Sequence, residues 1–129
     1  EMAETITAAR MAVWNRYHEA FASLEEEGKI ERPFIPQHCE HNAHMYYLKC
    51  KDLEERTAFI SFLKENGIWA VFHYVPLHSA PAGLRYARFH GEDRYTTRES
   101  ERLVRLPMYY GLKEEQVDYI ISKVKEFFR

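Results

Sequence analysis

The first two dozen residues carry a long helical pattern of apolar side chains. These side chains recur at steps of three and four residues, the spacing of one face of an α-helix, at Met2, Ile6, Ala9, Val13, Tyr17, Ala20, Phe21 and Leu24. Gly28 is placed to end this helix. Because most of the stability of an amphipathic helix comes from packing, the rest of the chain must supply a layer that covers the stripe.

The helical pattern has no visible start within the sequence. Its periodicity is present from Glu1 onward, and no N-capping residue precedes it. We therefore expect the sequence to be part of a longer chain.

The remaining residues alternate between strand and helix patterns. Two prolines, Pro33 and Pro36, favour an extended crossing after the first helix. We then expect a strand over 45–51, a helix over 53–65, a strand over 69–75, a long loop over 77–95, a short helix over 96–104, a third strand over 105–109 and a last helix striped by Val117, Ile120, Ile121, Val124, Phe127 and Phe128. This order predicts an α+β (α/β) fold in which helices pack on a small sheet.

Two capping signals mark helix starts. Asp52 with Glu55 three residues later is a capping box, and Thr96 with Glu99 repeats the pattern. The helix that follows Asp52 closes at Asn66 and Gly67. Its expected buried stripe is Leu53, Phe59, Ile60 and Leu63.

Composition limits the class of protein. The 129 residues suit one globular domain, with 46% hydrophobic and 29% charged side chains. The net charge of −2 gives no electrostatic reason to expect nucleic acid or a membrane as partner. The longest apolar run, 68–72, is too short to span a bilayer, and no signal peptide is visible. We expect a cytoplasmic protein with Cys39 and Cys50 reduced.

The stretch HCEHNAH, residues 38–44, holds three histidines and a cysteine. Zinc sites are usually built from two ligand pairs, each two to four residues apart. His38 and Cys39 are adjacent and tend to point apart, while His41 and His44 lack a second pair. We therefore expect no metal site, and these histidines are more simply explained as hydrogen-bonded surface residues.

A second stretch, HYVPLHSAPAG over 73–83, has a clearer link to binding. The predicted strand ends at Pro76 and leads into a loop, so His73, Tyr74 and His78 place hydrogen-bond donors at a sheet edge. Donors there suit an anionic or sugar ligand. The alternative is a turn in which His73 and Tyr74 are partly buried core residues.

Several motifs together resemble a known family. HYVPLHSAPAG, HNAHMYYLK, the run FHGEDRYTTRESERLVRLPMYYGL over 89–112 and the closing helix resemble the C-terminal small domain of the DegT/DnrJ/EryC1/StrS sugar aminotransferases. The resemblance covers essentially the whole chain, with the motifs in the same order. It implies that residues 1–129 are this small domain of a fold-type I, pyridoxal 5′-phosphate (PLP)-dependent transferase, with the large PLP-binding domain outside the sequence.

The resemblance also implies an activity for the longer protein. The family uses PLP, takes its amino group from L-glutamate and works as a homodimer with active sites at the subunit interface. The implied acceptor is C4 of a dTDP-linked 4-keto-6-deoxy sugar. The lysine that binds the cofactor and the Asp that pairs with the pyridinium nitrogen belong to the large domain, and neither motif occurs here. We expect no catalytic or cofactor-binding residue in this chain, and no activity from it alone.

The same resemblance points to residues that contact the substrate. It places HYVPLH in the cleft between the two domains, so His73, Tyr74 and His78 are predicted to bind the pyrophosphate or the sugar hydroxyls. Asn42 and His44, before the neighbouring strand, are further candidates. The alternative function is a stand-alone, non-enzymatic module that binds a sugar nucleotide or interacts through a metal.

Overall fold

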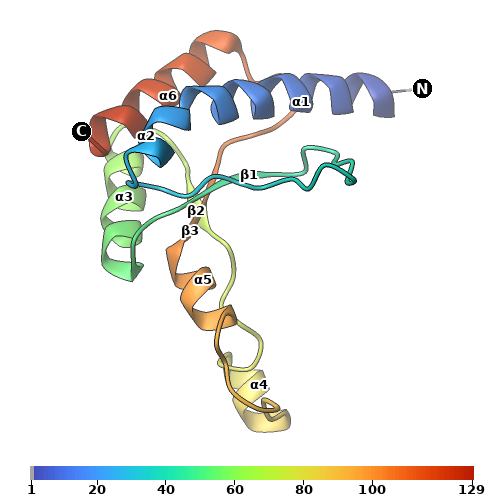
Figure 1. Cartoon of the computed structure of the whole chain (residues 1–129), viewed down its shortest axis with the longest axis vertical. Coiled ribbons are helices and arrows are strands. Elements are labelled where there is room, and N and C mark those ends of the chain that lie inside the picture. Colours follow the sequence, from blue (N-terminus) through green and yellow to red (C-terminus); the bar gives the residue numbers. More distant parts are fainter. Residues whose placement is uncertain (1) are drawn as a thin grey trace.

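The first and last helices, α1 (Ala3–Ala20) and α6 (Glu114–Phe127), pack against each other in the computed structural model, which describes residues 2–129 (Figure 1). Tyr17 of α1 packs on Tyr46 of the sheet, with ring centroids 5.3 Å apart. A short helix, α2 (Ala22–Glu26), follows α1. The end helices therefore form the layer that covers the sheet, and the predicted class of helices packed on a small sheet is confirmed.

The sheet has three antiparallel strands, β1 (Tyr46–Lys49), β2 (Val71–Phe72) and β3 (Leu103–Leu106). Their order is β1-β3-β2, so the last strand in sequence lies in the middle. The buried side chains of β1 and β3 alternate with less buried ones and form one face, made of Tyr46, Leu48, Val104 and Leu106.

The opposite face, which we call the outer face, carries Tyr47, Val71 and Arg105. Tyr47 and Val71 are both register partners of Arg105, and paired residues project to the same side of a sheet. Val71 is 43% exposed, so this face is not part of the core.

A narrow arm extends from the body of the molecule and contains α4 (Pro81–Tyr86) and α5 (Thr96–Arg102) (Figure 1). Neither helix has a buried residue. Helix α3 (Leu53–Glu65) lies in the body and contacts α5, α6 and β3. The arm therefore leaves the body near the junction of α3 and β3. No helix in residues 2–129 is long and apolar enough to cross a membrane.

The first predicted helix is broken in two. The backbone at Phe21 leaves the helical region, with φ −98° and ψ 7°, and α2 begins at the next residue. Trp14, outside the predicted stripe, is buried, whereas Met2 is 59% exposed. In α3, Phe59 and Leu63 are buried as predicted but Leu53 is 42% exposed, because the first turn projects beyond the core.

Boundaries after residue 69 were predicted wrongly. Only Val71–Phe72 pairs within the strand expected over 69–75, because Tyr74 turns the chain with a φ of 47°. The loop expected over 77–95 contains α4, which starts at Pro81 and is too short to show a helical period. Helix α5 ends at Arg102, and β3 occupies 103–106 instead of 105–109.

The two capping signals had different outcomes. Asp52 caps α3, since its carboxylate accepts a hydrogen bond from the Glu55 N–H at 2.9 Å. The Glu55 carboxylate reaches the Lys51 N–H at 2.7 Å, one residue before the expected partner. Thr96 is not a cap, because it is the first residue of α5 and its N–H donates to Asp93 at 2.9 Å.

Candidate functional site

The segment from His73 to Gly83 connects the sheet to the arm through a tight turn. The carbonyl of Pro76 accepts hydrogen bonds from the N–H groups of Ser79, at 3.1 Å, and Ala80, at 3.0 Å. Pro81 then starts α4, where its missing N–H costs nothing. The motif HYVPLHSAPAG thus ends in a folded turn and helix.

Gly83 is required by this turn. A Cβ atom at Gly83 would lie 1.7 Å from the Leu77 carbonyl oxygen, a distance that no side chain can occupy. Helix α4 therefore packs directly on the backbone that carries His78.

His78 is held by residues of the arm. Its Nε2 lies 2.8 Å from Asp93 Oδ2 and 3.4 Å from the Thr97 hydroxyl. Its ring packs against Phe89, with centroids 4.6 Å apart. The Thr97 hydroxyl, backbone N–H groups and His78 together hold the pKa of Asp93 below its usual value. Only Nδ1 of His78 remains for a ligand.

His73 and Tyr74 lie together where the arm meets the body. Their ring centroids are 5.1 Å apart, and Tyr74 is 69% exposed. Nδ1 of His73 is buried without a hydrogen-bond partner in the described residues. Burial, followed by the charges of Arg105 and His44, lowers the pKa of His73. A hollow of about 320 Å³ is lined by both residues together with Val75, Pro76, Thr96, Glu99, Ser100 and Leu103, but not by His78.

Asn42 and His44 flank Ala43, a buried residue with a φ of 48°. Both flanking side chains are exposed. His44 Nδ1 lies 3.4 Å from Arg10 Nη2. His44 also lines a hollow together with Arg105, whose guanidinium lies over the Tyr74 ring. Asn42 makes no hydrogen bond to the other four candidates within residues 2–129. The structure thus groups His44, His73 and Tyr74, whereas His78 and Asn42 stand apart.

The histidine-rich stretch forms a surface turn. His41 packs on Trp14 with ring centroids 4.5 Å apart, and its Nδ1 accepts the Ala43 N–H at 3.3 Å. His38 and Cys39 are exposed. Over the described part of the chain, no three His, Cys, Asp or Glu side chains come together in a way that could hold a metal ion.

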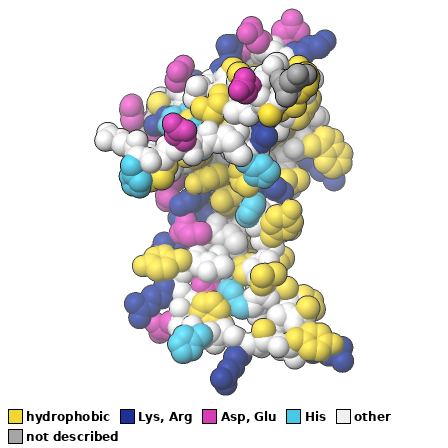
Figure 2. Space-filling model, turned by 90° about the vertical axis from the view of Figure 1, so that its right-hand side faces the viewer, with side chains coloured by type: hydrophobic (Ala, Val, Ile, Leu, Met, Phe, Trp, Pro, Cys, Tyr) yellow, Lys and Arg dark blue, Asp and Glu magenta, His cyan; other side chains and the backbone are white. Residues whose placement is uncertain are grey.

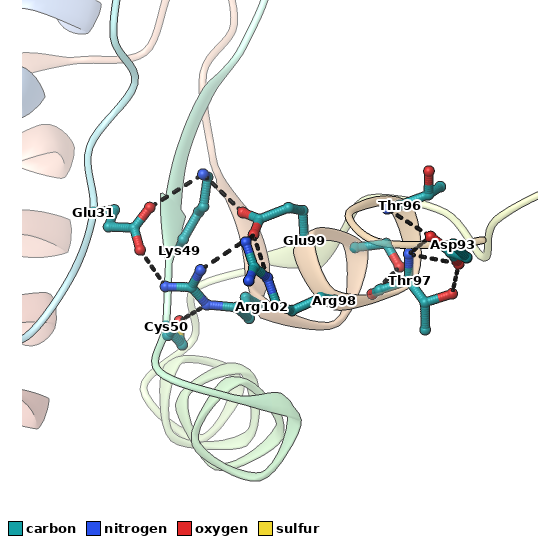
Figure 3. A network of polar contacts seen from close by, with 10 residues as sticks. Glu31, Lys49, Cys50, Asp93, Thr96, Thr97, Arg98, Glu99 and Arg102 are labelled. Atoms are coloured by element: carbon teal, nitrogen blue, oxygen red, sulfur yellow. Dashed lines mark hydrogen bonds and ion pairs between the residues drawn. The ribbon is translucent and has the colours of Figure 1, made fainter.

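A polar network that sequence reasoning missed anchors the base of the arm (Figure 3). Lys49 of β1 pairs with Glu31, at 3.1 Å, and with Glu99 of α5, at 2.8 Å. Arg102 pairs with both of these carboxylates and donates from Nε to the Cys50 carbonyl at 2.8 Å. The network fixes α5 to β1, and its four members are too far apart in sequence for a local pattern to reveal it.

The lysines bear on where PLP could bind. Burial alone would lower the pKa of Lys49, but hydrogen bonds to Glu99 and Glu31 raise it, so the amine stays protonated and unsuited to a Schiff base. Lys51 is exposed, and Lys64 lies over the Trp69 ring at 5.8 Å on the outside of α3. These lysines do not fit the cofactor, so no step through PLP is assigned to this chain.

Comparison with known proteins decides the family. The sequence profile of the DegT/DnrJ/EryC1/StrS aminotransferase family matches residues 1–125. The chain belongs to this aminotransferase family. The family resemblance of the motifs is therefore confirmed.

Individual relatives agree with this assignment. A pleiotropic regulatory protein of Geobacillus stearothermophilus is 29% identical over 116 residues, which are 88% of this chain and 31% of the relative. The structure of the aminotransferase TlmJ from Streptoalloteichus hindustanus matches with a TM-score of 0.84 at 20% identity, over 98% of this chain and 32% of that one. The PLP form of a sugar aminotransferase from Streptococcus pneumoniae matches with a TM-score of 0.77 at 26% identity, over 97% and 32%. The chain thus spans about a third of the length of these proteins.

Proposed function

We propose that residues 1–129 are the C-terminal small domain of a PLP-dependent sugar aminotransferase. The full-length protein would move an amino group from L-glutamate to C4 of a dTDP-4-keto-6-deoxy sugar, as a cytoplasmic homodimer. Within the family, the proposed activity is that of dTDP-4-amino-4,6-dideoxygalactose transaminase, also called dTDP-4-oxo-6-deoxy-D-glucose transaminase, which serves enterobacterial common antigen synthesis. The family match over residues 1–125 carries this proposal, together with the motifs that resemble this enzyme.

The chain's own residues bind and orient the substrate in this proposal. His73 and Tyr74 lie together at the junction between body and arm, and Arg105 links them to His44, so imidazole and phenol groups there can donate to phosphate or sugar oxygens. His78 would contribute Nδ1 from the arm, and Asn42 its amide from the turn before β1. Each of these groups positions the nucleotide sugar, and none takes or gives a proton at C4.

The cofactor chemistry is assigned to the large domain. When bound, PLP supplies an electron sink that stabilises negative charge at the carbon that loses or gains a proton. Lys49 is locked in ion pairs and cannot replace the missing Schiff-base lysine. We therefore propose that the 129-residue chain alone does not transaminate.

The direct test uses the full-length protein. Incubated with PLP, L-glutamate and a dTDP-4-keto-6-deoxy sugar, it should form 2-oxoglutarate and a dTDP-4-amino sugar in equal amounts, measured by mass spectrometry. The isolated 129-residue chain is the matched control and should form neither. If the full-length protein binds dTDP but transfers no amino group to any nucleotide ketosugar, the non-enzymatic sugar-nucleotide module is the better description. One zinc per chain after dialysis would support the metal-dependent alternative.

A further inference from the structure

Arg105 occupies the centre of the outer face of the sheet. It lies on β3, the middle strand, and has Tyr47 and Val71 as register partners on either side. Its guanidinium lies over the Tyr74 ring, 5.4 Å from the centroid. A cation in the middle of a sheet face, beside proposed substrate contacts, needs an explanation.

Arg105 has no acidic partner in the described part of the chain. Five other arginines pair with carboxylates: Arg16 with Asp118, Arg32 with Glu25, Arg94 with Glu92, Arg98 with Glu99 and Arg102 with Glu31. Nε is buried without a hydrogen bond in both Arg56 and Arg105, but Arg56 donates from Nη1 to the Ser100 carbonyl at 3.1 Å, whereas Arg105 makes no side-chain hydrogen bond within residues 2–129. A buried polar group is normally hydrogen-bonded, so an unpaired one points to a partner from elsewhere.

A second unpaired group lies next to it. Nδ1 of His73 is also buried without a partner in residues 2–129, and the His73 ring lies 5.1 Å from the Tyr74 ring that Arg105 covers. His44 is a third nitrogen-bearing side chain here, because it lines the same hollow as Arg105. Two residues with buried, unsatisfied nitrogen atoms therefore flank the same Tyr74 ring.

The walls around Arg105 favour a negatively charged ligand. Arg105 and His44 line a hollow of about 270 Å³ whose other residues are uncharged: Met45, Trp69, Val71, Leu106, Pro107 and Met108. Figure 2 shows histidine and basic side chains beside hydrophobic ones where the body narrows to the arm. Among residues 2–129, Arg105 and His44 are thus the only residues lining this hollow whose side chains can carry a positive charge, and no acidic side chain lines it. A hydrogen bond from a guanidinium to an anion is roughly twice as strong as one between neutral groups.

We propose that Arg105, with His73 and His44 beside it, forms a binding site for an anionic oxygen group of a reactant, a carboxylate or a phosphate. A planar guanidinium can bind either group with two parallel hydrogen bonds. This inference rests on the proposed function, whose reactants carry both groups: the carboxylates of glutamate and the pyrophosphate of the nucleotide sugar. It adds Arg105, which no sequence motif singled out.

The test measures anion binding without turnover. Glutarate stands in for the donor's carboxylates and inorganic pyrophosphate for the nucleotide, each titrated by calorimetry into the full-length protein. We expect at least one of them to bind, and Arg105→Gln to weaken that binding roughly tenfold or more, since a charged hydrogen bond is lost. Loss of glutarate binding identifies the donor site, and loss of pyrophosphate binding identifies the nucleotide site.

Two further variants separate binding from folding. Arg105→Lys keeps the charge but not the two-pronged geometry, so it should recover part of the affinity. Arg94→Gln, at an exposed arginine of the arm, is the matched control and should bind like the wild type. A bound anion would also raise the pKa of His73, so the affinity for glutarate, whose carboxylates stay ionised near neutral pH, should increase as the pH falls, and His73→Asn should reduce this dependence, with His44 accounting for any remainder.

The outcomes distinguish this inference from the proposed function. If neither anion binds the wild type, or if Arg105→Gln binds both as tightly as the wild type, the anion site is overturned, whether or not the protein transaminates. If both Arg105 variants lower Tm and binding together, the residue is structural and the proposal also fails. If the anion binds through Arg105 but no amino transfer occurs with any nucleotide ketosugar, the site stands and the proposed function fails.

Discussion

His78 and Asp93 join the two sides of the arm, with His78 Nε2 2.8 Å from Asp93 Oδ2. The same carboxylate accepts hydrogen bonds from the N–H of Thr96 at 2.9 Å, the N–H of Thr97 at 3.3 Å and the Thr97 hydroxyl. One acidic side chain therefore caps α5 and holds the loop that carries His78. Since Nε2 is engaged, the orientation of Nδ1 toward a ligand depends on Asp93.

The first prediction concerns Asp93 as a positioning residue. In the full-length enzyme, Asp93→Ala should raise KM for the nucleotide sugar several-fold and change kcat little, because His78 loses its fixed orientation. Asp93→Asn keeps an acceptor oxygen and should recover part of the loss. Glu92→Ala, at the neighbouring exposed carboxylate, is the control and should behave as the wild type. Steady-state kinetics check this, and equal effects of Asp93→Ala and Glu92→Ala would contradict it.

The second prediction concerns His78 itself. If Nδ1 binds the sugar nucleotide without taking part in proton transfer, His78→Ala removes an interaction shared by ground and transition states, so KM rises while kcat is nearly unchanged. Loss of one charged hydrogen bond should lower kcat/KM roughly ten- to a hundred-and-fifty-fold.

The two half-reactions decide the role of His78. The half-reaction with glutamate should be nearly unaffected, since the donor carries no nucleotide. A variant that also loses the glutamate half-reaction would place His78 at the cofactor. Wild-type kinetics with both substrates would leave His78 with the structural role that its contacts with Asp93 and Phe89 already give it.

Some of the fold was predictable because its signals are local. Asp52 caps α3 within three residues, Gly67 follows its end with a φ of 75°, and the stripe of α6 repeats along most of its 14 residues. Each of these features depends on neighbours in sequence.

The features that define the candidate site are not local. Asp93 pairs with His78, 15 residues earlier in a segment with no period, and Arg105 lies on the outer face because of the register of β1 and β2 with β3. Thr96 had the sequence of a cap, but α5 begins at Thr96 itself and the Asp93 carboxylate accepts from the N–H groups of Thr96 and Thr97, the first two residues of the helix. Tertiary contacts, not propensity, decided these positions.

The third prediction concerns Gly83. Gly83→Ala would drive a methyl group into the Leu77 carbonyl, so the turn must open, at a cost of about 1–3 kcal/mol typical of overpacking. Hydrogen exchange of the Leu84 N–H, which is bonded to the Ala80 carbonyl at 2.9 Å, should become faster. Ala82→Ser, at an exposed position of the same helix, is the control. Unchanged exchange in Gly83→Ala would show that α4 does not depend on this close approach.

The last prediction concerns acid stability and the network at the base of the arm. We expect the 129-residue chain to unfold cooperatively at pH 7, because it buries a core of its own that includes Tyr17, Phe59 and Val104. The hydrogen bond from Arg102 lowers the pKa of Glu31, and that from Lys49 lowers the pKa of Glu99.

Both carboxyl groups thus have folded pKa values below the unfolded value of about 4.3, so their stabilisation is present above that pH and is lost as the pH falls through the folded values. Urea unfolding at a series of pH values should show this loss. Arg102→Gln should lower the free energy of unfolding by about 1–2 kcal/mol at pH 7, a value already reduced to allow for the solvent exposure of Glu31. It should also make the free energy of unfolding fall less steeply as the pH is lowered. Arg98→Gln removes only an exposed partner of Glu99, so it should change the free energy of unfolding and its pH dependence much less. If the free energy of unfolding of Arg102→Gln falls as steeply with decreasing pH as that of the wild type, other carboxylates control stability in acid.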